Sequence, residues 1–269
     1  MRAQNRTEIA SLLERHGLSP NRRLGQHFLA DANITRKIVG VAEVKEGDRV
    51  VEIGAGTGTL TSALAATGAE VVAYEVDHGL GRVLEDVLSE AAVEIRIADI
   101  TTVDLGRELV GGPWKMVANL PYNVGTPLVL DSMRRHMNIE LFVVLVQREV
   151  AERFVARPGT REYGLPSVVA QVYTRPEVAF RVPPQVFFPP PSVESAVVVM
   201  RRIPAPAGAE RAVAIAQAAF GQRRKMLRRS LDALLDEPVR ALEEAGIDPT
   251  RRAEELSPAQ YLELARLAP

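Results

Sequence analysis

Short apolar runs alternate with helix-like stretches along the first half of the chain, and this alternation limits the possible folds more than any other feature. The runs are Arg49–Ile53, Glu70–Tyr74, Val93–Ile97, Lys115–Ala118 and Ile139–Val146. Apolar strands separated by helices are typical of a parallel sheet that helices cover on both faces. We therefore predict an α/β fold with a doubly wound, mostly parallel sheet.

The remainder of the chain predicts an edge pair of strands followed by a small helical domain. The runs Glu177–Val182 and Ser195–Met200 flank a proline-rich segment, and their close spacing predicts an antiparallel pair at the sheet edge. Pro204–Gly208 (PAPAG) is typical of a linker. We predict two domains, residues 1–203 and a small all-α domain of residues 204–269.

The last helix of that domain has a clear predicted start. Ser257 is a capping residue, Pro258 suits the first helical turn, and Gln260 can complete a capping box.

Composition excludes several classes of chemistry. The chain has no cysteine, so disulfides, thiolate zinc sites and cysteine nucleophiles are excluded. Its four histidines are scattered and lack the spacing of metal ligands, so we expect no metal. The longest apolar run, Leu141–Val146, is too short to cross a bilayer, and the first thirty residues lack the apolar stretch of a signal peptide. We expect a cytoplasmic protein.

Residues 50–61 (VVEIGAGTGTLT) predict a buried strand, a tight glycine turn and a helix. Gly54, Gly56 and Gly58 would let the backbone approach a ligand and adopt positive φ. The G-x-G-x-G spacing differs from that of dinucleotide-binding sites, and no Lys-Ser/Thr pair follows as in a P-loop. The turn therefore favours neither a pyrophosphate nor a triphosphate, and a purely structural strand-to-helix corner remains an alternative.

Two acids follow the next two strands and complete a predicted adenosine pocket. Glu75 could accept both ribose hydroxyls, and Asp99 could accept a hydrogen bond from an adenine amine. Taken singly, Glu75 could be a solvated strand end and Asp99 a cap for a helix that begins at Ile100. An acidic pocket without lysine suits the sulfonium cation of S-adenosylmethionine.

The motif Asn119-Leu120-Pro121-Tyr122-Asn123 follows the fourth strand on the same edge. The side-chain oxygen of Asn119 and the carbonyl of Leu120 could accept the N–H groups of an adenine amine and direct its lone pair at a methyl donor. Pro121 would stiffen the turn, and Tyr122 would stack on the base. A structural Asx-turn loop is the alternative.

With these motifs the chain resembles the KsgA family, the small-subunit rRNA adenine N6,N6-dimethyltransferases, over nearly its whole length. The matching stretches are Leu24–Leu29 (LGQHFL), Val51–Thr61, Tyr74–Asp77 (YEVD), Ala98–Ile100 (ADI), Asn119–Asn123 (NLPYN), Phe187–Val198 (FFPPPSVESAVV) and Phe220–Leu231 (FGQRRKMLRRSL). The resemblance implies a Rossmann-like domain, S-adenosylmethionine as cofactor, and two adjacent adenines in a hairpin loop near the 3′ end of 16S rRNA as substrate.

The resemblance also implies residue roles. Gln26 and His27 would close over the methionine end of the cofactor, and Phe187 would stack on the target base opposite Tyr122. The implied cofactor contacts are Gln26, His27, Leu29, Gly54, Ala55, Gly56, Gly58, Glu75, Val76, Asp99, Ile100 and Asn119. His27 stands where many relatives carry Asn, and Leu165-Pro166 replaces the Arg-Leu that often follows Tyr-Gly.

A cluster of cations suggests how RNA would be bound. Phe220, Leu227, Leu231 and Leu234 would form one stripe of a helix, with the basic residues pointing away from it. The predicted phosphate contacts are Arg223, Arg224, Lys225, Arg228 and Arg229, although basic helix faces are often only solvated.

The expected partner is the small ribosomal subunit, bound by a monomer. Three alternatives stay open: a large-subunit (23S) rRNA adenine methyltransferase of the macrolide-resistance type, a DNA adenine methyltransferase, and a ribosome-assembly factor that acts mainly by binding RNA.

Overall fold

The computed structural model describes residues 4–121 and 125–267, which form two compact units. The first unit comprises Met1–Ala151 and Val178–Arg201, and the second comprises Glu152–Glu177 and Arg202–Pro269. The domain division at residues 203/204 stays a prediction. The structure differs from it in grouping Glu152–Glu177 with the second unit, and no change of composition in the sequence marks that segment.

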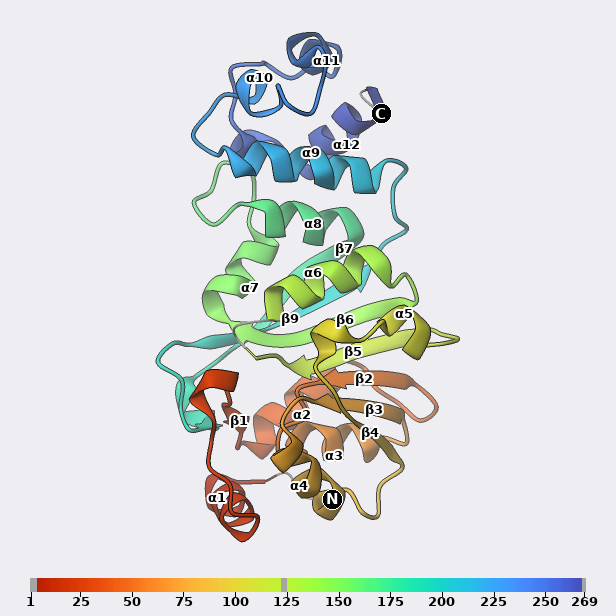
Figure 1. Cartoon of the computed structure of the whole chain (residues 1–269), viewed down its shortest axis with the longest axis vertical. Coiled ribbons are helices and arrows are strands. Elements are labelled where there is room, and N and C mark those ends of the chain that lie inside the picture. The colour runs from red at the N-terminus through yellow and green to blue at the C-terminus, as the bar shows by residue number, and fades with distance from the viewer. Residues whose placement is uncertain (1–3, 122–124, 268–269) are drawn as a thin grey trace. The chain divides into compact units, whose positions relative to one another are not determined.

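A seven-stranded sheet forms the centre of the first unit, with the strand order β4-β3-β2-β5-β6-β9-β7 (Figure 1). The strands β2 to β6 pair in parallel, and β9 runs antiparallel to β6. Their bounds are β2 Arg49–Ile53, β3 Glu70–Glu75, β4 Val93–Ile97, β5 Trp114–Asn119, β6 Ile139–Gln147, β7 Thr174–Val182 and β9 Ser195–Arg202. The predicted doubly wound, mostly parallel fold is confirmed, and β7 and β9 are neighbours at one edge.

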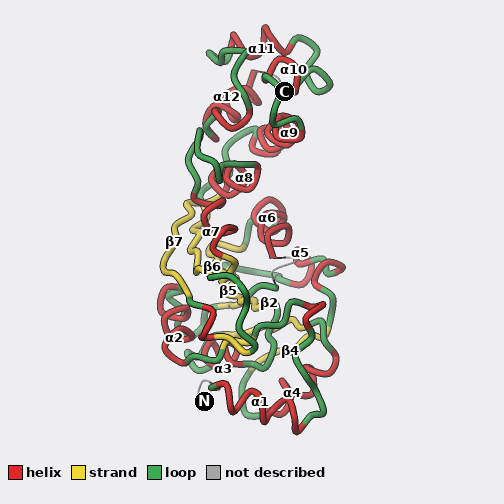
Figure 2. Tube along the Cα trace, turned by 90° about the vertical axis from the view of Figure 1, so that its left-hand side faces the viewer, coloured by secondary structure: helices red, strands yellow, loops and turns green. Residues whose placement is uncertain are grey.

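Helices pack against both faces of this sheet. Ile38 of α2 and Leu60 and Leu64 of α3 belong to one buried cluster with strand residues such as Val50 and Val143. Figure 2 shows α2 and α6 on opposite sides of the strands. The helices around the sheet are α1 Arg6–Arg15, α2 Ala32–Val41, α3 Thr59–Ala65, α4 His78–Val87, α5 Leu105–Glu108, α6 Gly125–Arg135 and α7 Arg148–Val155.

Short elements complete the first unit. A two-stranded antiparallel sheet pairs β1, Phe28–Leu29, with β8, Phe187–Phe188. It joins the N-terminal segment to the proline-rich segment, which lies far away in the sequence. The 3-10 turns η1 Arg22–Leu24, η2 Ile100–Thr102 and η3 Pro184–Val186 lie in the connections.

The second unit is mostly helical, with α8 before β9 in the chain and its other complete helices after β9. It contains α8 Leu165–Tyr173, α9 Ala209–Gly221, α10 Leu227–Ser230, α11 Pro238–Glu244, η4 Ala253–Glu255 and α12 Pro258–Leu267. Its core includes the rings of Tyr163, Phe220 and Tyr261. The ring centroid of Phe220 lies 6.1 Å from that of Tyr163 and 6.4 Å from that of Tyr261. The capping box predicted for the last helix is present, because Ser257 N donates to Gln260 Oε1 over 3.0 Å.

The basic segment departs from the single helix that the sequence predicted. Helix α9 ends at Gly221, a turn follows, and the four-residue α10 begins at Leu227. Leu227 and Leu231 are nevertheless buried, as the predicted stripe requires. The helical periodicity therefore identified the buried face correctly and missed the break.

Candidate active site

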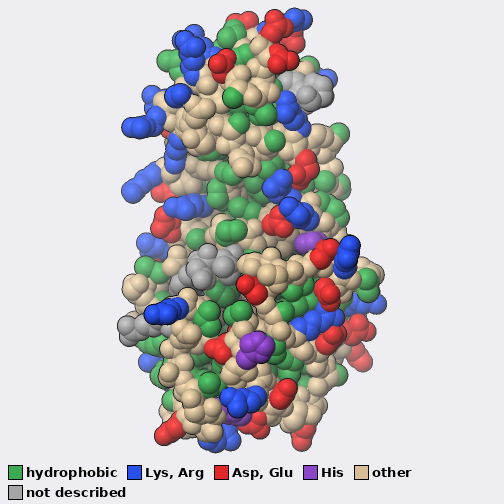
Figure 3. Space-filling model, in the orientation of Figure 1, with side chains coloured by type: hydrophobic (Ala, Val, Ile, Leu, Met, Phe, Trp, Pro, Cys, Tyr) green, Lys and Arg blue, Asp and Glu red, His purple; other side chains and the backbone are tan. Residues whose placement is uncertain are grey.

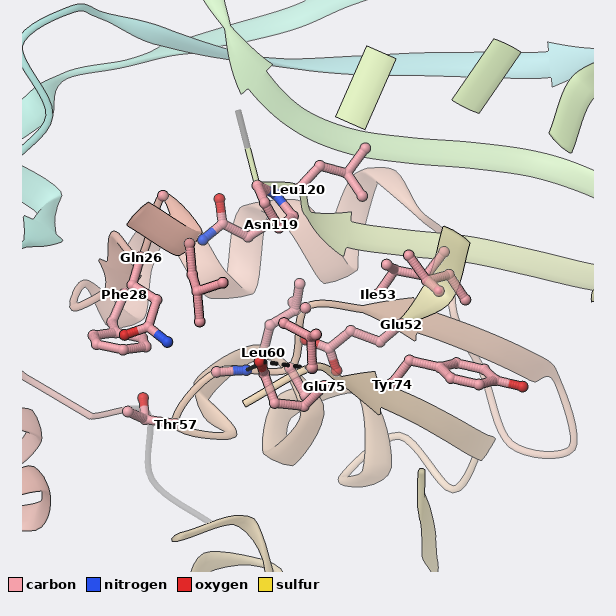
Figure 4. Close-up of a pocket in the computed structure, with 18 of the residues that line it drawn as sticks. Gln26, Phe28, Glu52, Ile53, Thr57, Leu60, Tyr74, Glu75, Asn119 and Leu120 are labelled. Atoms are coloured by element: carbon pink, nitrogen blue, oxygen red, sulfur yellow. Dashed lines mark hydrogen bonds between the residues drawn. The ribbon is translucent and has the colours of Figure 1, made fainter. Parts of the chain in front are cut away.

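A cavity of about 310 Å³ opens at the carboxyl edge of strands β2, β3, β4 and β5 (Figure 4). This volume lies within the range of small-molecule sites. Residues after four successive parallel strands line it, together with the N-terminal segment Leu24–Leu29. The predicted site residues that line it are Gln26, His27, Leu29, Gly54, Ala55, Gly56, Glu75, Val76, Asp99, Ile100, Asn119, Leu120 and Pro121.

Two other parts of the chain, at Phe28 and at Pro121, pack closely against the glycine turn between β2 and α3. At Gly56, with φ +60°, a Cβ atom would lie 3.0 Å from Cδ1 of Phe28. At Gly54, with φ +79°, it would lie 3.3 Å from Cδ of Pro121. Both positions therefore need glycine for backbone conformation and for space. Gly58 does not line the cavity; it precedes α3 with φ +81°.

The carboxylate of Glu75 holds the turn in place. Its Oε2 accepts a hydrogen bond from Gly56 N over 2.8 Å, and its Oε1 accepts from Val76 N and Asp77 N over 2.9 and 3.0 Å. Burial raises the pKa of Glu75, although these hydrogen bonds oppose the shift. A carboxylate has about four acceptor positions, so Glu75 can still accept from a ligand hydroxyl.

Asp99 caps the 3-10 turn that begins at Ile100, which was the alternative role considered for it in the sequence analysis. Its Oδ1 accepts from Thr101 N over 2.9 Å and from Thr101 Oγ1 over 2.7 Å, and these bonds lower the pKa of its carboxyl. Asp99 also lines the cavity, so capping does not exclude a ligand contact. Beside it, Val76 is 43% exposed and Ile100 is 9% exposed, which provides apolar surface for a flat ring.

The N-terminal segment packs over the glycine turn. Gln26 lines the cavity, but its amide already bonds within the protein: Nε2 donates to Asp77 Oδ2 over 2.9 Å and Oε1 accepts from Asn21 N over 2.7 Å. His27 Nδ1 bonds to Pro189 O over 2.7 Å. A carbonyl only accepts, so Nδ1 carries the proton in that bond.

At the end of β5, the transfer motif faces the same cavity. Asn119 Nδ2 donates to His27 O over 3.1 Å, which leaves the side-chain oxygen as the acceptor that Asn119 can offer. Figure 4 shows Asn119 and Leu120 above the glycine turn that Glu75 holds. Leu120 and Pro121 line the cavity with it. Tyr122 and Asn123, the rest of the predicted motif, lie outside the described residues.

Phe187 requires a correction. We predicted its ring to stack on the target base, but in the structure its exposure is 0%. The residue pairs with Leu29 through the β1–β8 sheet, and its ring belongs to the core cluster that includes Leu29 and Val197. An aromatic ring can stack on a ligand only through an exposed face, so Phe187 in this conformation supports the cavity wall from behind.

Glu52 is a cavity residue that the sequence analysis missed. It is 1% exposed on β2, and its Oε2 finds no hydrogen bond among the described residues. Burial and the nearby charge of Glu75 raise the pKa of Glu52 to about 8. A single acid in the otherwise apolar run Val50–Ile53 was the signal that could have revealed it. Thr57 and Thr59 also line the cavity and were not predicted.

The basic residues of the second unit divide into two groups. Arg224, Lys225, Arg228 and Arg229 are exposed, as a phosphate-binding surface requires. Arg223 instead pairs with Glu254, with Nε 2.6 Å from Oε2.

The residues around the cavity fit S-adenosylmethionine. Among the residues that the structure describes, the lining contains the acids Glu75 and Asp99 and no lysine or arginine, which suits a cation without phosphates. Within residues 4–121 and 125–267, no cluster of three or more His, Asp or Glu side chains could hold a metal ion. Over the same ranges, no helix is long and apolar enough to cross a membrane.

The strand order and this cavity together define a Rossmann-like methyltransferase domain. Comparison with protein families shows which kind of methyltransferase this is. Residues 17–268 match the model of the family described as "Ribosomal RNA adenine dimethylase". The chain belongs to the ribosomal RNA adenine dimethylase family.

Relatives of similar length carry one common name, "Ribosomal RNA small subunit methyltransferase A". The protein of that name from Pelotomaculum thermopropionicum is 44% identical, covering 96% of this chain and 94% of the relative. Those from Magnetococcus marinus and Streptococcus pneumoniae (strain P1031) are 42% and 39% identical, and each aligns over at least 95% of both chains.

Solved structures share the fold. A dimethyladenosine transferase from Plasmodium falciparum superposes with a TM-score of 0.75 at 21% identity, covering 88% of this chain and 96% of that one. The 23S rRNA methyltransferase ErmE superposes with a TM-score of 0.68 at 26% identity, covering 90% of this chain and 99% of that one.

Proposed function

We propose that the protein transfers methyl groups from S-adenosylmethionine to the N6 amines of two adjacent adenines in a hairpin loop near the 3′ end of 16S rRNA, during assembly of the small ribosomal subunit. One observation carries the proposal: the glycine turn and the transfer motif meet in one cavity. A Cβ atom at Gly54 would lie 3.3 Å from Pro121 Cδ and 3.5 Å from Asn119 O. A cofactor on the turn is therefore next to any base that Asn119 binds.

The chain's own residues have distinct tasks in this reaction. Glu75 orders the turn and can accept from ribose hydroxyls, while Val76 and Ile100 offer apolar surface to the adenine ring of the cofactor. The side-chain oxygen of Asn119 accepts an N–H of the target amine, and the Leu120 carbonyl accepts the other. When bound, S-adenosylmethionine would supply an electrophilic methyl group to the amine that Asn119 and Leu120 hold, and would leave as the neutral thioether S-adenosylhomocysteine.

No general base is needed in the transfer step. The neutral amine attacks, and the methylated nitrogen then releases its extra proton to water. The contribution of Asn119 and Leu120 is to orient the lone pair, because that pair is otherwise delocalised into the purine ring.

The exposed cations of the second unit would bind the RNA backbone. Arg224, Lys225, Arg228 and Arg229 can each neutralise a phosphate, so affinity should fall steeply with salt. A hairpin loop is a favourable target, because flipping an unpaired base costs less than flipping one in a duplex.

The similarity to ErmE favours methylation of 23S rRNA as the second candidate. Incubation of labelled S-adenosylmethionine with isolated small subunits, large subunits and DNA separates the possibilities. We expect mass spectrometry to find two adjacent dimethyladenosines in the small-subunit rRNA. Label confined to the large subunit would establish the 23S reaction instead, and RNA binding without methyl transfer would indicate an assembly factor.

We also propose that one chain acts alone in the cytoplasm, because the glycine turn and the Asn119 motif already meet in one cavity without a second copy of the chain. Sedimentation of the pure protein, with and without RNA, tests the monomer.

A further inference from the structure

The loop between α7 and α8 carries two arginines that the proposed function has not used. Arg157 and Arg161 are both exposed. Neither guanidinium has a hydrogen bond or ion pair with any residue in the described part of the chain. Glu162 is the only acid in residues 157–164, so this segment, here called the arginine loop, has a net charge of +1.

The backbone of the arginine loop is tied down at several points. Gly159 N donates to Glu254 O over 2.7 Å, and Thr160 Oγ1 donates to Arg157 O over 2.7 Å. At the end of the loop Tyr163 is buried and donates its hydroxyl proton to Leu256 O over 2.8 Å. The loop is thus anchored to the segment around η4, while its two arginine side chains are exposed to solvent.

Arg223 connects this loop to the basic turn after α9. Its Nε bonds to Glu254 Oε2 over 2.6 Å, and its Nη2 donates to Arg161 O over 3.3 Å. The charge of Arg223 is therefore balanced by Glu254, and two of its donors are already in use. Its neighbours Arg224 and Lys225 are exposed and have no such partner among the described residues.

The loop and the turn lie on the same side of the second unit. In Figure 1 both lie to the left of α8 and α9, and the bond from Arg223 to Arg161 O joins them. Figure 3 shows Lys and Arg side chains gathered along that margin. Clustered cations on neighbouring, anchored backbone are suited to a polyanion, because each guanidinium can bind a phosphate in bidentate fashion.

We propose that the arginine loop is a second part of the RNA-binding surface, in which Arg157 and Arg161 contact phosphates, and that Arg223 is a positioning residue that holds this loop beside the basic turn. The inference rests on the proposed function for its ligand, an RNA backbone. It reassigns Arg223, which the sequence had placed among the phosphate contacts, and it adds two residues from outside the predicted helical domain.

The salt dependence of RNA binding tests the loop directly. For a small-subunit rRNA fragment that contains the hairpin, we expect Arg157→Ala/Arg161→Ala to reduce the log–log salt slope by about 1.4 to 1.8, from about 0.7 to 0.9 per phosphate contact. The control Arg240→Ala/Arg266→Ala removes two exposed arginines of the same unit that are paired with acids, and should keep the wild-type slope. A wild-type slope in the loop variant overturns the proposal.

A charge-neutral exchange tests the role of Arg223. Arg223→Gln/Glu254→Gln removes an internal ion pair without changing net charge, and Arg224→Gln removes one exposed cation. We expect the first to lower the slope by up to about 1.4 to 1.8, because the loop that Arg223 holds carries two phosphate contacts, and to cause no further loss when it is added to Arg157→Ala/Arg161→Ala. We expect Arg224→Gln to lower the slope by about 0.7 to 0.9 in either background, and a further loss of that size on adding Arg223→Gln/Glu254→Gln to the loop variant would show that Arg223 contacts phosphate itself and would overturn its positioning role.

Methyl incorporation into the same RNA by the wild-type chain is measured in parallel. Its absence would refute the proposed function and leave the slope comparison valid, since phosphate binding does not require the reaction. Normal methylation together with an unchanged slope in the loop variant would refute only the further inference.

Discussion

The side-chain amide of Asn119 donates a hydrogen bond to the main-chain oxygen of His27 over 3.1 Å. This bond crosses from the end of β5 to the segment just before β1, and it fixes which atom of the amide can serve a substrate. The nitrogen is occupied by a protein acceptor, so the oxygen is available to accept an N–H. The N-terminal segment thereby orients the residue to which we assign the methyl-transfer step.

Asn119→Ala should abolish methyl transfer and leave RNA affinity nearly unchanged. Loss of one oriented acceptor in a transition state typically costs about 10²- to 10³-fold in rate. Labelled methyl incorporation and RNA binding by the same preparation measure both effects. Asn33→Ala, at an exposed position of α2, is the control that should behave as wild type. Normal methylation by the Asn119 variant would show that the catalytic assignment is wrong.

Gly56→Ala should weaken cofactor binding at least tenfold and destabilise the protein. The new Cβ would lie 3.0 Å from Phe28 at a φ of +60°, and such strain costs on the order of 1–3 kcal/mol. Calorimetric titration with S-adenosylmethionine and thermal unfolding report the two effects. The matched control is Gly40→Ala on α2, where nothing lies within 4 Å of the new Cβ, so stability should rise slightly. Equal behaviour of the two variants would contradict the tight fit at Gly56.

The fold and the cavity were largely accessible from the sequence because they depend on local patterns. Apolar runs identified five parallel strands, and the carboxyl edge of such a sheet collects the residues that follow each strand. Gly54, Glu75, Asp99 and Asn119 were selected by the glycine spacing, by the acids at the strand ends and by the Asn119 motif, and this rule placed them at one edge.

The remaining features depend on contacts between distant segments, which no local pattern encodes. Phe187 was placed by resemblance, and only the β1–β8 pairing shows that its ring is buried. Arg223 looked like its basic neighbours, because its partner Glu254 lies 31 residues further along the chain. The break after Gly221 was missed because a helix of the same periodicity would bury the same leucines.

Gln4→Ala should weaken cofactor binding roughly three- to tenfold. The Gln4 amide donates to Thr57 O over 2.8 Å and accepts from Thr59 Oγ1 over 3.1 Å, so it braces the glycine turn from outside the family match, which begins at residue 17. Each such bond contributes about 0.5–1.5 kcal/mol. Titration with S-adenosylhomocysteine measures the change. Thr7→Ala on the exposed side of α1 should have no effect, and an unaltered affinity in the Gln4 variant would argue against the brace.

Charge reversal at Arg224, Arg228 and Arg229 should lower RNA affinity strongly and leave cofactor affinity intact. Loss of three phosphate contacts should also reduce the log–log salt slope by about 2 to 3. Filter binding over a series of salt concentrations gives both values, and cofactor titration shows that the first unit is unaffected. A triple variant that bound RNA as tightly as wild type would place the RNA elsewhere.

Glu52→Gln should remove a pH dependence of stability that the wild type shows between about pH 4.5 and pH 8. Burial raises the pKa of Glu52 from 4.5 to about 8, so between these values the folded chain holds a proton that the unfolded chain has released. Stability therefore falls as pH rises through this window, by an amount on the order of a few kcal/mol, and becomes constant above it.

Glutamine stays neutral at every pH, so the variant should gain stability relative to wild type as pH increases from 5 to 8. Denaturant unfolding at several pH values measures the difference, with Glu90→Gln at an exposed site as the control. Parallel stability curves for wild type and Glu52→Gln would mean that Glu52 is ionised in the folded protein, with its charge compensated inside the cavity.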